Sequence, residues 1–158
     1  MLYLKEAFKE LMSKLYTTKY ILIGGQAVNL YGYCRNTNDI DIIVPFDIQN
    51  TNVLIRILTN MGYNKTSTKD NRELGELLTL SPVELHRYST ICVEGAELWP
   101  LDILFTTQYN RYNELVRIAK YEGIKINLID LQDLFIMKRR AGRLQDKLDI
   151  ENLTEGDK

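Results

Sequence analysis

Several residue types that mark particular protein classes are scarce in this chain. It has two cysteines, Cys34 and Cys92, with no CxxC pair, so we expect neither a disulfide framework nor a cysteine metal site. We expect both to be buried, reduced thiols. It has three prolines and no proline-rich linker, and its longest uncharged stretch, residues 20–34, is too short and too polar to span a bilayer. These absences exclude a secreted disulfide scaffold and a membrane-spanning protein.

An excess of charge of either sign is also missing. Lysine and arginine number 20 against 21 acidic residues, which argues against a broad, sequence-independent grip on nucleic acid but leaves room for a local basic patch. Charged residues within the first 16 positions are not those of a secretory signal, so we expect a cytoplasmic protein. With 45% hydrophobic residues in 158, we expect one domain over residues 1–153 and a loose tail over 154–158.

Helical and strand patterns alternate, which predicts a mixed α/β (α+β) fold with a small sheet flanked by helices and with helices at the C-terminal end. The middle is less regular, with a polar loop over 67–82 that includes a helical turn or two near 73–78. The predicted helices are 4–15, 26–31, 53–61, 112–119, 131–141 and 144–153. The predicted strands are 20–23, 40–44, 84–93, 97–105 and 124–129, with a hairpin turn at 94–95.

Gly24 and Gly25 stand between a predicted strand and a predicted helix. Glycines there let the backbone approach a ligand, and free N–H groups at a helix start favour an anion such as phosphate. The alternative is a tight strand-to-helix turn. The segment fits neither the GxxxxGK[ST] nor the GxGxxG phosphate loop.

Asp39 and Asp41 flank Ile40 at the start of a predicted strand. Residues two apart in a strand share a face, so their carboxylates would lie side by side and repel each other. A divalent cation relieves that repulsion, and magnesium prefers such oxygen ligands together with substrate phosphates. The alternative is a pair of solvated acids.

Asp102 lies inside an apolar predicted strand, where an unpaired acid is rare. It is either a paired or metal-ligating group, or an acid on the solvent side of a one-sided sheet. Leu104 shares its face, which weakens the second interpretation.

A hydrophobic strand, Gly24-Gly25, a helix, Asp39-x-Asp41 and a later acid in a strand together resemble the nucleotidyltransferase superfamily of DNA polymerase beta. The resemblance implies that the glycines hold the phosphates of a nucleotide. It implies that the two aspartates ligate Mg²⁺ and that Asp102 completes the metal site and helps to activate the acceptor hydroxyl. Gly25 replaces the serine usual in the family.

The segments at 23–41 and 133–150 are similar to small stand-alone bacterial and archaeal nucleotidyltransferases, including toxins of abortive-infection toxin–antitoxin systems. Lys138 continues an apolar stripe that begins at Leu131, so it either snorkels outward or reaches inward to an anion; the resemblance implies contact with the triphosphate. Arg35 and Arg143 are expected at the nucleotide, or are solvated arginines. Asp146 could instead pair with a basic neighbour.

The single histidine and three of the tyrosines can each be explained by a structural role. His86, the sole histidine, has no histidine partner for a metal, and we expect it on a strand surface. Tyr109, Tyr112 and Tyr121 either stack on bases or are core and rim residues.

The expected function is magnesium-dependent transfer of a nucleoside monophosphate from an NTP to a hydroxyl acceptor, with release of pyrophosphate. The acceptor would be an RNA end, a protein or a small molecule, in a toxin–antitoxin or phage-defence setting, and an antitoxin or a second copy of the chain would help to complete the site. Two alternatives stay open. One is a catalytically silent nucleotide- or partner-binding module of this fold, and the other is a plain α/β interaction domain with solvated acids.

Overall fold

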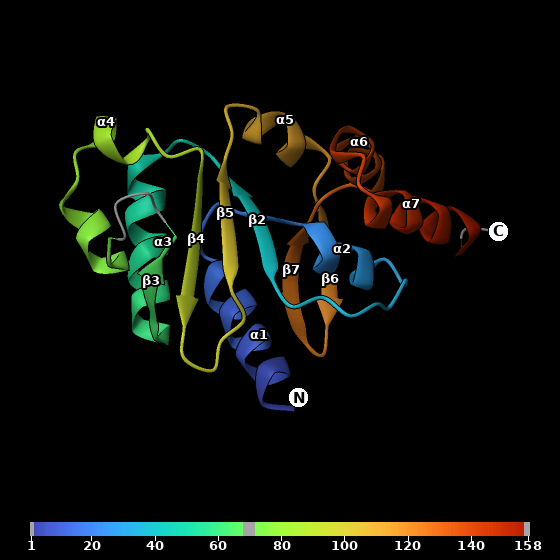
Figure 1. Ribbon diagram of the computed structural model, residues 1–158, viewed down its shortest axis with the longest axis horizontal. Helices are drawn as coiled ribbons and strands as arrows, with labels where there is room; N and C mark the ends of the chain where they lie inside the picture. The colour runs from blue at the N-terminus through green and yellow to red at the C-terminus, as the bar shows by residue number, and fades with distance from the viewer. Residues whose placement is uncertain (1, 68–71, 157–158) are drawn as a thin grey trace.

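One seven-stranded mixed sheet forms the centre of the computed structural model, which describes residues 2–67 and 72–156 (Figure 1). The strand order is β3-β4-β5-β2-β1-β7-β6. The strands are β1 Ile21–Ile23, β2 Ile40–Val44, β3 Tyr63–Thr66, β4 Thr90–Gly95, β5 Leu101–Phe105, β6 Arg117–Tyr121 and β7 Ile124–Leu128. The helices are α1 Leu2–Leu15, α2 Gly24–Leu30, α3 Ile48–Met61, α4 Pro82–Leu85, α5 Tyr109–Glu114, α6 Leu131–Ala141 and α7 Leu144–Gly156, with a 3-10 helix, η1, at Leu74–Thr79.

The helices divide between the two sides of the sheet's centre. Helices α3 and α4 lie beside β3 and β4, whereas α2, α6 and α7 lie toward β7 and β6 (Figure 1). Helix α1 packs against α3 and β7 and buries Leu11, Met12 and Leu15. Of the described helices, none combines the length and apolarity needed to cross a membrane.

The pairing of strands β2 and β5 positions two of the predicted site aspartates. They pair in parallel, with Asp41 opposite Asp102. Ile40 and Ile42 of β2 and Ile103 of β5 are buried, so the alternating pleat of each strand turns its acid to the other face. Burial of the apolar face therefore determines where the two carboxylates point.

Several sequence-based predictions are confirmed. The mixed α/β class is correct, and β2 and α6 occupy the predicted ranges 40–44 and 131–141. Asp130 caps α6, and its carboxylate accepts a hydrogen bond from the Gln132 N–H at 3.1 Å. Helix α3 ends at Met61, as predicted, and Gly62 follows it as the C-cap with a left-handed φ of 106°.

Other predictions were wrong where tertiary pairing overrides local pattern. The expected strand over 84–93 instead begins with the last two residues of helix α4, which Ser81 and Glu84 start with a capping box, and β4 begins only at Thr90. The expected helix over 112–119 ends at Glu114, because residues 117–121 pair with β7 as a hairpin. Strand β3 was not predicted.

The remaining differences lie at element ends. Helix α2 begins at Gly24 itself, and β4 runs through Gly95, so the hairpin turn lies after the predicted 94–95. In the loop expected over 67–82, η1 at Leu74–Thr79 confirms the helical turns predicted near 73–78, and residues 68–71 lie outside the described residues. Helix α7 includes residues 154–156 of the expected tail, and 157–158 lie outside the described residues.

A substitution at Gly95 would test the packing between β4 and the end of α3. A Cβ at Gly95 would lie 2.5 Å from the backbone oxygen of Gly62, whereas a Cβ at Gly75 would meet nothing within 4 Å. We expect Gly95→Ala to lower the free energy of unfolding by about 1–3 kcal/mol, since backbone must shift to admit the methyl group. Gly75→Ala is the matched control and should not be less stable. Urea unfolding of both variants checks this, and equal stabilities would contradict it.

Candidate active site

Three aspartates converge on one face of the sheet. One carboxylate oxygen from each of Asp39, Asp41 and Asp102 lies within 4.8 Å of the others. The parallel register of β2 and β5 brings Asp41 and Asp102 together, and Asp39 joins them from the residue before β2. The Thr37 hydroxyl donates a hydrogen bond to Asp39 Oδ1 at 3.2 Å and so helps to orient that carboxylate.

Glycines allow the start of α2 to approach these residues. Gly24 has a φ of +69°, and a Cβ there would overlap the Asp41 carboxylate, lying 2.9 Å from its Cγ. A Cβ on Gly25 would lie 2.7 Å from the Thr37 hydroxyl and 3.0 Å from Arg35 Nη2. Both positions therefore need glycine for space, and Gly24 needs it for its backbone conformation as well.

The trio concentrates negative charge. Burial, followed by the charges of Asp39 and Asp102, raises the pKa of Asp41 to about 7, and Lys138 opposes that rise. A divalent cation would remove this repulsion, and a set of carboxylate oxygens matches the ligand preference of magnesium. The three side chains present therefore fit a hard divalent cation.

A second cluster joins α6 to α7 and to the loop before β2. The buried Lys138 ammonium donates to Asp149 at 2.8 Å and to Asp146 at 3.2 Å. Arg35 donates to Asp149 through Nε at 2.8 Å and Nη2 at 3.1 Å, and Arg143 Nε donates to Asp146 at 2.8 Å. These hydrogen bonds outweigh burial and lower the pKa of both carboxyls.

This basic network shows which of the alternatives predicted for Lys138, Arg35, Arg143 and Asp146 the structure adopts. Lys138 reaches inward to anions and does not snorkel, Asp146 pairs with basic neighbours, and Arg35 and Arg143 are both ion-paired. Sequence reasoning missed the importance of Asp149. Its signal was the i,i+3 spacing from Asp146, which places both carboxylates on one face of α7.

A cavity of about 410 Å³ connects the two clusters. Gly24 and Asp41 line it together with Lys138 and Arg143. Its remaining wall is largely apolar, with side chains from β2, β5, α5 and α6, including Tyr112. Three cations, Lys138, Arg140 and Arg143, and two carboxylates, Asp41 and Asp146, line this cavity.

Cys92 is a neighbour of Asp102 that sequence reasoning also missed. The two residues face each other across β4 and β5. Burial, together with the hydrogen bond and charge of Asp102, raises the pKa of the Cys92 thiol to about 12, so the thiol stays neutral. The expectation of two buried thiols is wrong, because Cys34 is exposed in the loop after α2 and Cys92 is only partly buried.

The single histidine lies away from the acids. His86 follows α4, so it is not on a strand surface, and its ring packs 5.3 Å from that of Phe46 and 6.1 Å from that of Phe105. Tyr109 and Tyr112 are buried, as a core role predicts.

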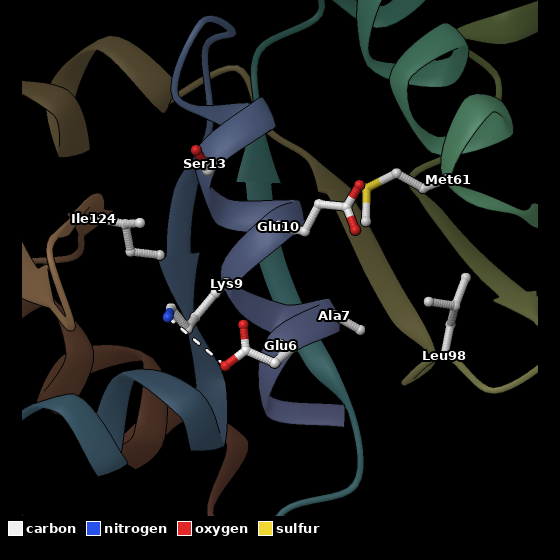
Figure 2. A pocket seen from close by; sticks show the side chains of 8 residues that line it. All are labelled: Glu6, Ala7, Lys9, Glu10, Ser13, Met61, Leu98 and Ile124. Atoms are coloured by element: carbon white, nitrogen blue, oxygen red, sulfur yellow. Dashed lines mark ion pairs between the residues drawn. The ribbon is translucent and has the colours of Figure 1, made fainter. Parts of the chain in front are cut away.

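A different cavity, of about 460 Å³, lies along α1 (Figure 2). Glu10 of α1 points toward Met61, and Leu98 and Ile124 lie on either side of the helix (Figure 2). No residue predicted to belong to the functional site lines this cavity.

A substitution of Lys138 would test how much the basic network stabilises the fold. We expect Lys138→Met to lower the free energy of unfolding by about 3 kcal/mol, because it removes a buried cation and leaves two buried carboxylates less well compensated. Lys147→Met, an exposed change on α7, is the matched control and should cost little. Equal urea midpoints for the two variants would show that the network does not hold α7 to α6.

Asp41 tests the repulsion within the trio. Because the pKa of Asp41 rises from 3.8 to about 7 on folding, the folded protein holds this proton more tightly than the unfolded chain. The stability that this group contributes is therefore lost as pH rises between these values. Without added metal, Asp41→Asn should be more stable than the parent at pH 8, by on the order of 1–2 kcal/mol, and the gain should shrink at pH 5. Urea unfolding at both pH values measures this, and a gain that grows at pH 5 would refute it.

Comparison with known structures identifies the type of fold. No protein-family model matches the chain, and no curated protein does. The lincosamide antibiotic adenylyltransferase LnuA, solved with lincomycin bound, is similar over 97% of this chain and 93% of its own, at 21% identity and a TM-score of 0.62. An antigenic nucleotidyltransferase-like protein from Paracoccidioides brasiliensis is similar over 96% and 74%, at 16% identity and 0.62.

The polyadenylate synthase of Megavirus covers 95% of this chain and 30% of its own, at 13% identity and a TM-score of 0.55. At such low sequence identities, the similarity to these structures shows a shared fold. By its strand order, its flanking helices and these neighbours, the chain has the nucleotidyltransferase fold.

Proposed function

We propose that this protein is a divalent-metal-dependent nucleotidyltransferase. It would transfer a nucleoside monophosphate from an NTP to a hydroxyl group and release pyrophosphate. The observation that carries the proposal is the approach of Asp39, Asp41 and Asp102 to within 4.8 Å beside Gly24, in a nucleotidyltransferase fold. A structural role does not require three carboxylates to gather where they repel one another.

Each aspartate has a role in this proposal. Asp39 and Asp41 would hold the cation, with Thr37 orienting Asp39. Asp102 would complete the ligand set and face the attacking hydroxyl. Bound magnesium would supply neutralising charge to the triphosphate and a lower pKa for the acceptor hydroxyl.

The 410 Å³ cavity is the proposed nucleotide site. Its basic side, Lys138 and Arg143, suits phosphates, and its apolar wall suits a base and sugar. Gly24 and Gly25 admit the phosphates to the backbone. Arg35 acts through Asp149, which it holds against Lys138.

The reaction that follows is an in-line displacement. The acceptor oxygen attacks the α-phosphorus, the bond from that phosphorus to the bridging oxygen breaks, and pyrophosphate leaves. The hydroxyl proton passes to Asp102 or to solvent. Catalysis would come mainly from positioning and from compensation of charge.

The acceptor class differs among the structural neighbours, whose names include a lincosamide adenylyltransferase and a polyadenylate synthase. The proposal keeps an RNA end, a protein or a small molecule as acceptor. It also keeps a cytoplasmic protein, a toxin–antitoxin setting, and an antitoxin or second copy as partner.

Labelling tests the proposal. The protein is incubated with magnesium, total cellular RNA and protein, and each NTP labelled at the α-phosphate. We expect one fraction to become labelled, and Asp41→Asn or Asp102→Asn to reduce labelling by roughly 100-fold or more, since each removes a ligand needed in the transition state. The exposed Glu94→Gln change on β4 should have no effect.

Label at the γ-phosphate should not be incorporated, because it leaves with pyrophosphate. Chelation by EDTA should abolish labelling. Full labelling by a folded Asp41→Asn variant would refute the proposed site. Nucleotide binding without incorporation into any acceptor would favour a silent module of the same fold.

A further inference from the structure

A third cavity, of about 580 Å³, lies outside the proposed nucleotide site and is larger than the two described above. It is formed by the N-terminal half of α1, by α2, by the loop over residues 34–38 and by single aromatic residues from the ends of two other segments. None of the three clustered aspartates lines it, although the loop that forms one wall leads directly into Asp39.

Aromatic rings form one side of this cavity. Phe8, Trp99 and Tyr121 line it, and the Phe8 ring lies 6.2 Å from Trp99 and 5.9 Å from Tyr121, centroid to centroid. Trp99 and Tyr121 are only partly buried and so present some ring surface to a ligand, although the Lys5 ammonium lies over the Tyr121 ring, 5.9 Å from its centroid. Such surfaces bind planar rings by stacking.

Carboxamides form much of the polar lining. Gln26, Asn29, Asn36 and Asn38 each bring a group that can both donate and accept hydrogen bonds. Gln26 is 7% exposed, and its buried Nε2 has no hydrogen-bond partner among the described residues. A buried donor without a partner costs free energy, so an acceptor atom on a ligand would be favourable there.

Charge narrows the class of ligand. No acidic residue is among the described residues that line this cavity. Its two cations are already paired, Lys5 with Glu122 and Arg35 with Asp149. A polycation would find no carboxylate in the lining, and an aliphatic chain would leave the carboxamides unpaired. A planar, uncharged ring with both donors and acceptors satisfies all of these groups.

One residue connects this cavity to the acids. Thr37 lines the cavity, and its hydroxyl donates to Asp39 Oδ1 at 3.2 Å. A ligand in the cavity therefore lies against the segment that orients the first of the three carboxylates.

We propose that this aromatic–carboxamide cavity binds a nucleobase, and that through it the protein receives the nucleoside that carries the acceptor hydroxyl. The second clause rests on the proposed nucleotidyl transfer, whereas the first does not. The nucleobase stacks on the open faces of Trp99 and Tyr121, and the Gln26 amide hydrogen-bonds its edge.

Binding is measured without metal or NTP. Trp99 is the only tryptophan of the chain, so its fluorescence reports on the cavity directly. Each of the four ribonucleosides is titrated into the full-length protein with selective tryptophan excitation. We expect saturable quenching by at least one nucleoside and none by ribose. No saturable change with any of the four would overturn the proposal.

Variants locate the site. Gln26→Met and Tyr121→Leu should each weaken the binding roughly fivefold to tenfold, since each removes one polar or stacking contact. Gln132→Met and Tyr16→Leu, which alter exposed residues outside the cavity, are the matched controls and should bind as the parent does. Equal affinities in all four variants would place the nucleoside elsewhere and refute the assignment.

A third measurement separates this inference from the proposed enzyme function. Asp41→Asn should still bind nucleoside, because Asp41 does not line the cavity. If transfer is detected, Tyr121→Leu should raise KM for an RNA or nucleoside acceptor at unchanged KM for NTP. An unchanged acceptor KM would refute the acceptor role alone. Nucleoside binding without any transfer would overturn the proposed function and leave the binding site standing.

Discussion

The parallel pairing of β2 with β5 is the constraint on which the rest of the site depends. It fixes Asp41 opposite Asp102, and the burial of Ile40, Ile42 and Ile103 prevents either strand from turning its acid away. The hydrophobic free energy of the core thus holds carboxylates at a separation that they would avoid in water, and the raised pKa of Asp41 records that opposition. The candidate site carries electrostatic repulsion because burial of the apolar residues beneath it fixes the positions of its carboxylates.

The basic network complements this arrangement beside the proposed nucleotide cavity, which Lys138 and Arg143 line together with Asp41. Lys138 belongs to α6, its two carboxylate partners belong to α7, and Arg35 belongs to the loop that leads to Asp39. One buried cluster therefore ties the loop before β2 to two consecutive helices near the C-terminal end of the chain. The same ion pairs position the cations beside the cavity and hold the C-terminal helix in place, so structural and functional roles cannot be separated residue by residue. The unpaired amide of Gln26 lies beyond this arrangement, in a cavity with a separate aromatic lining.

Local chemistry was informative wherever the chain's own pattern sufficed. The alternation around Asp39 and Asp41 predicted a strand with two acids on one face, and helical spacing predicted α6 over 131–141. Prediction was wrong over 112–119, where apolar spacing suggested a helix but the chain turns and pairs with β7. Hairpin pairing stabilises that segment through contacts which periodicity alone does not contain. Asp149 was overlooked for a similar reason, since its partners Lys138 and Arg35 lie 11 and 114 residues away.

By itself the sequence determined the class of fold, the glycine pair, the three acids and the extent of the helix that carries Lys138. These features follow from strand and helix periodicity and from the cost of burying unpaired charge, which act over a few residues. Only the tertiary structure decided that Asp102 meets Asp39 and Asp41, that two arginines and a lysine share two carboxylates, and that carboxamides gather around three rings. Those arrangements depend on strand register and helix docking, which are set by the packing of the whole core.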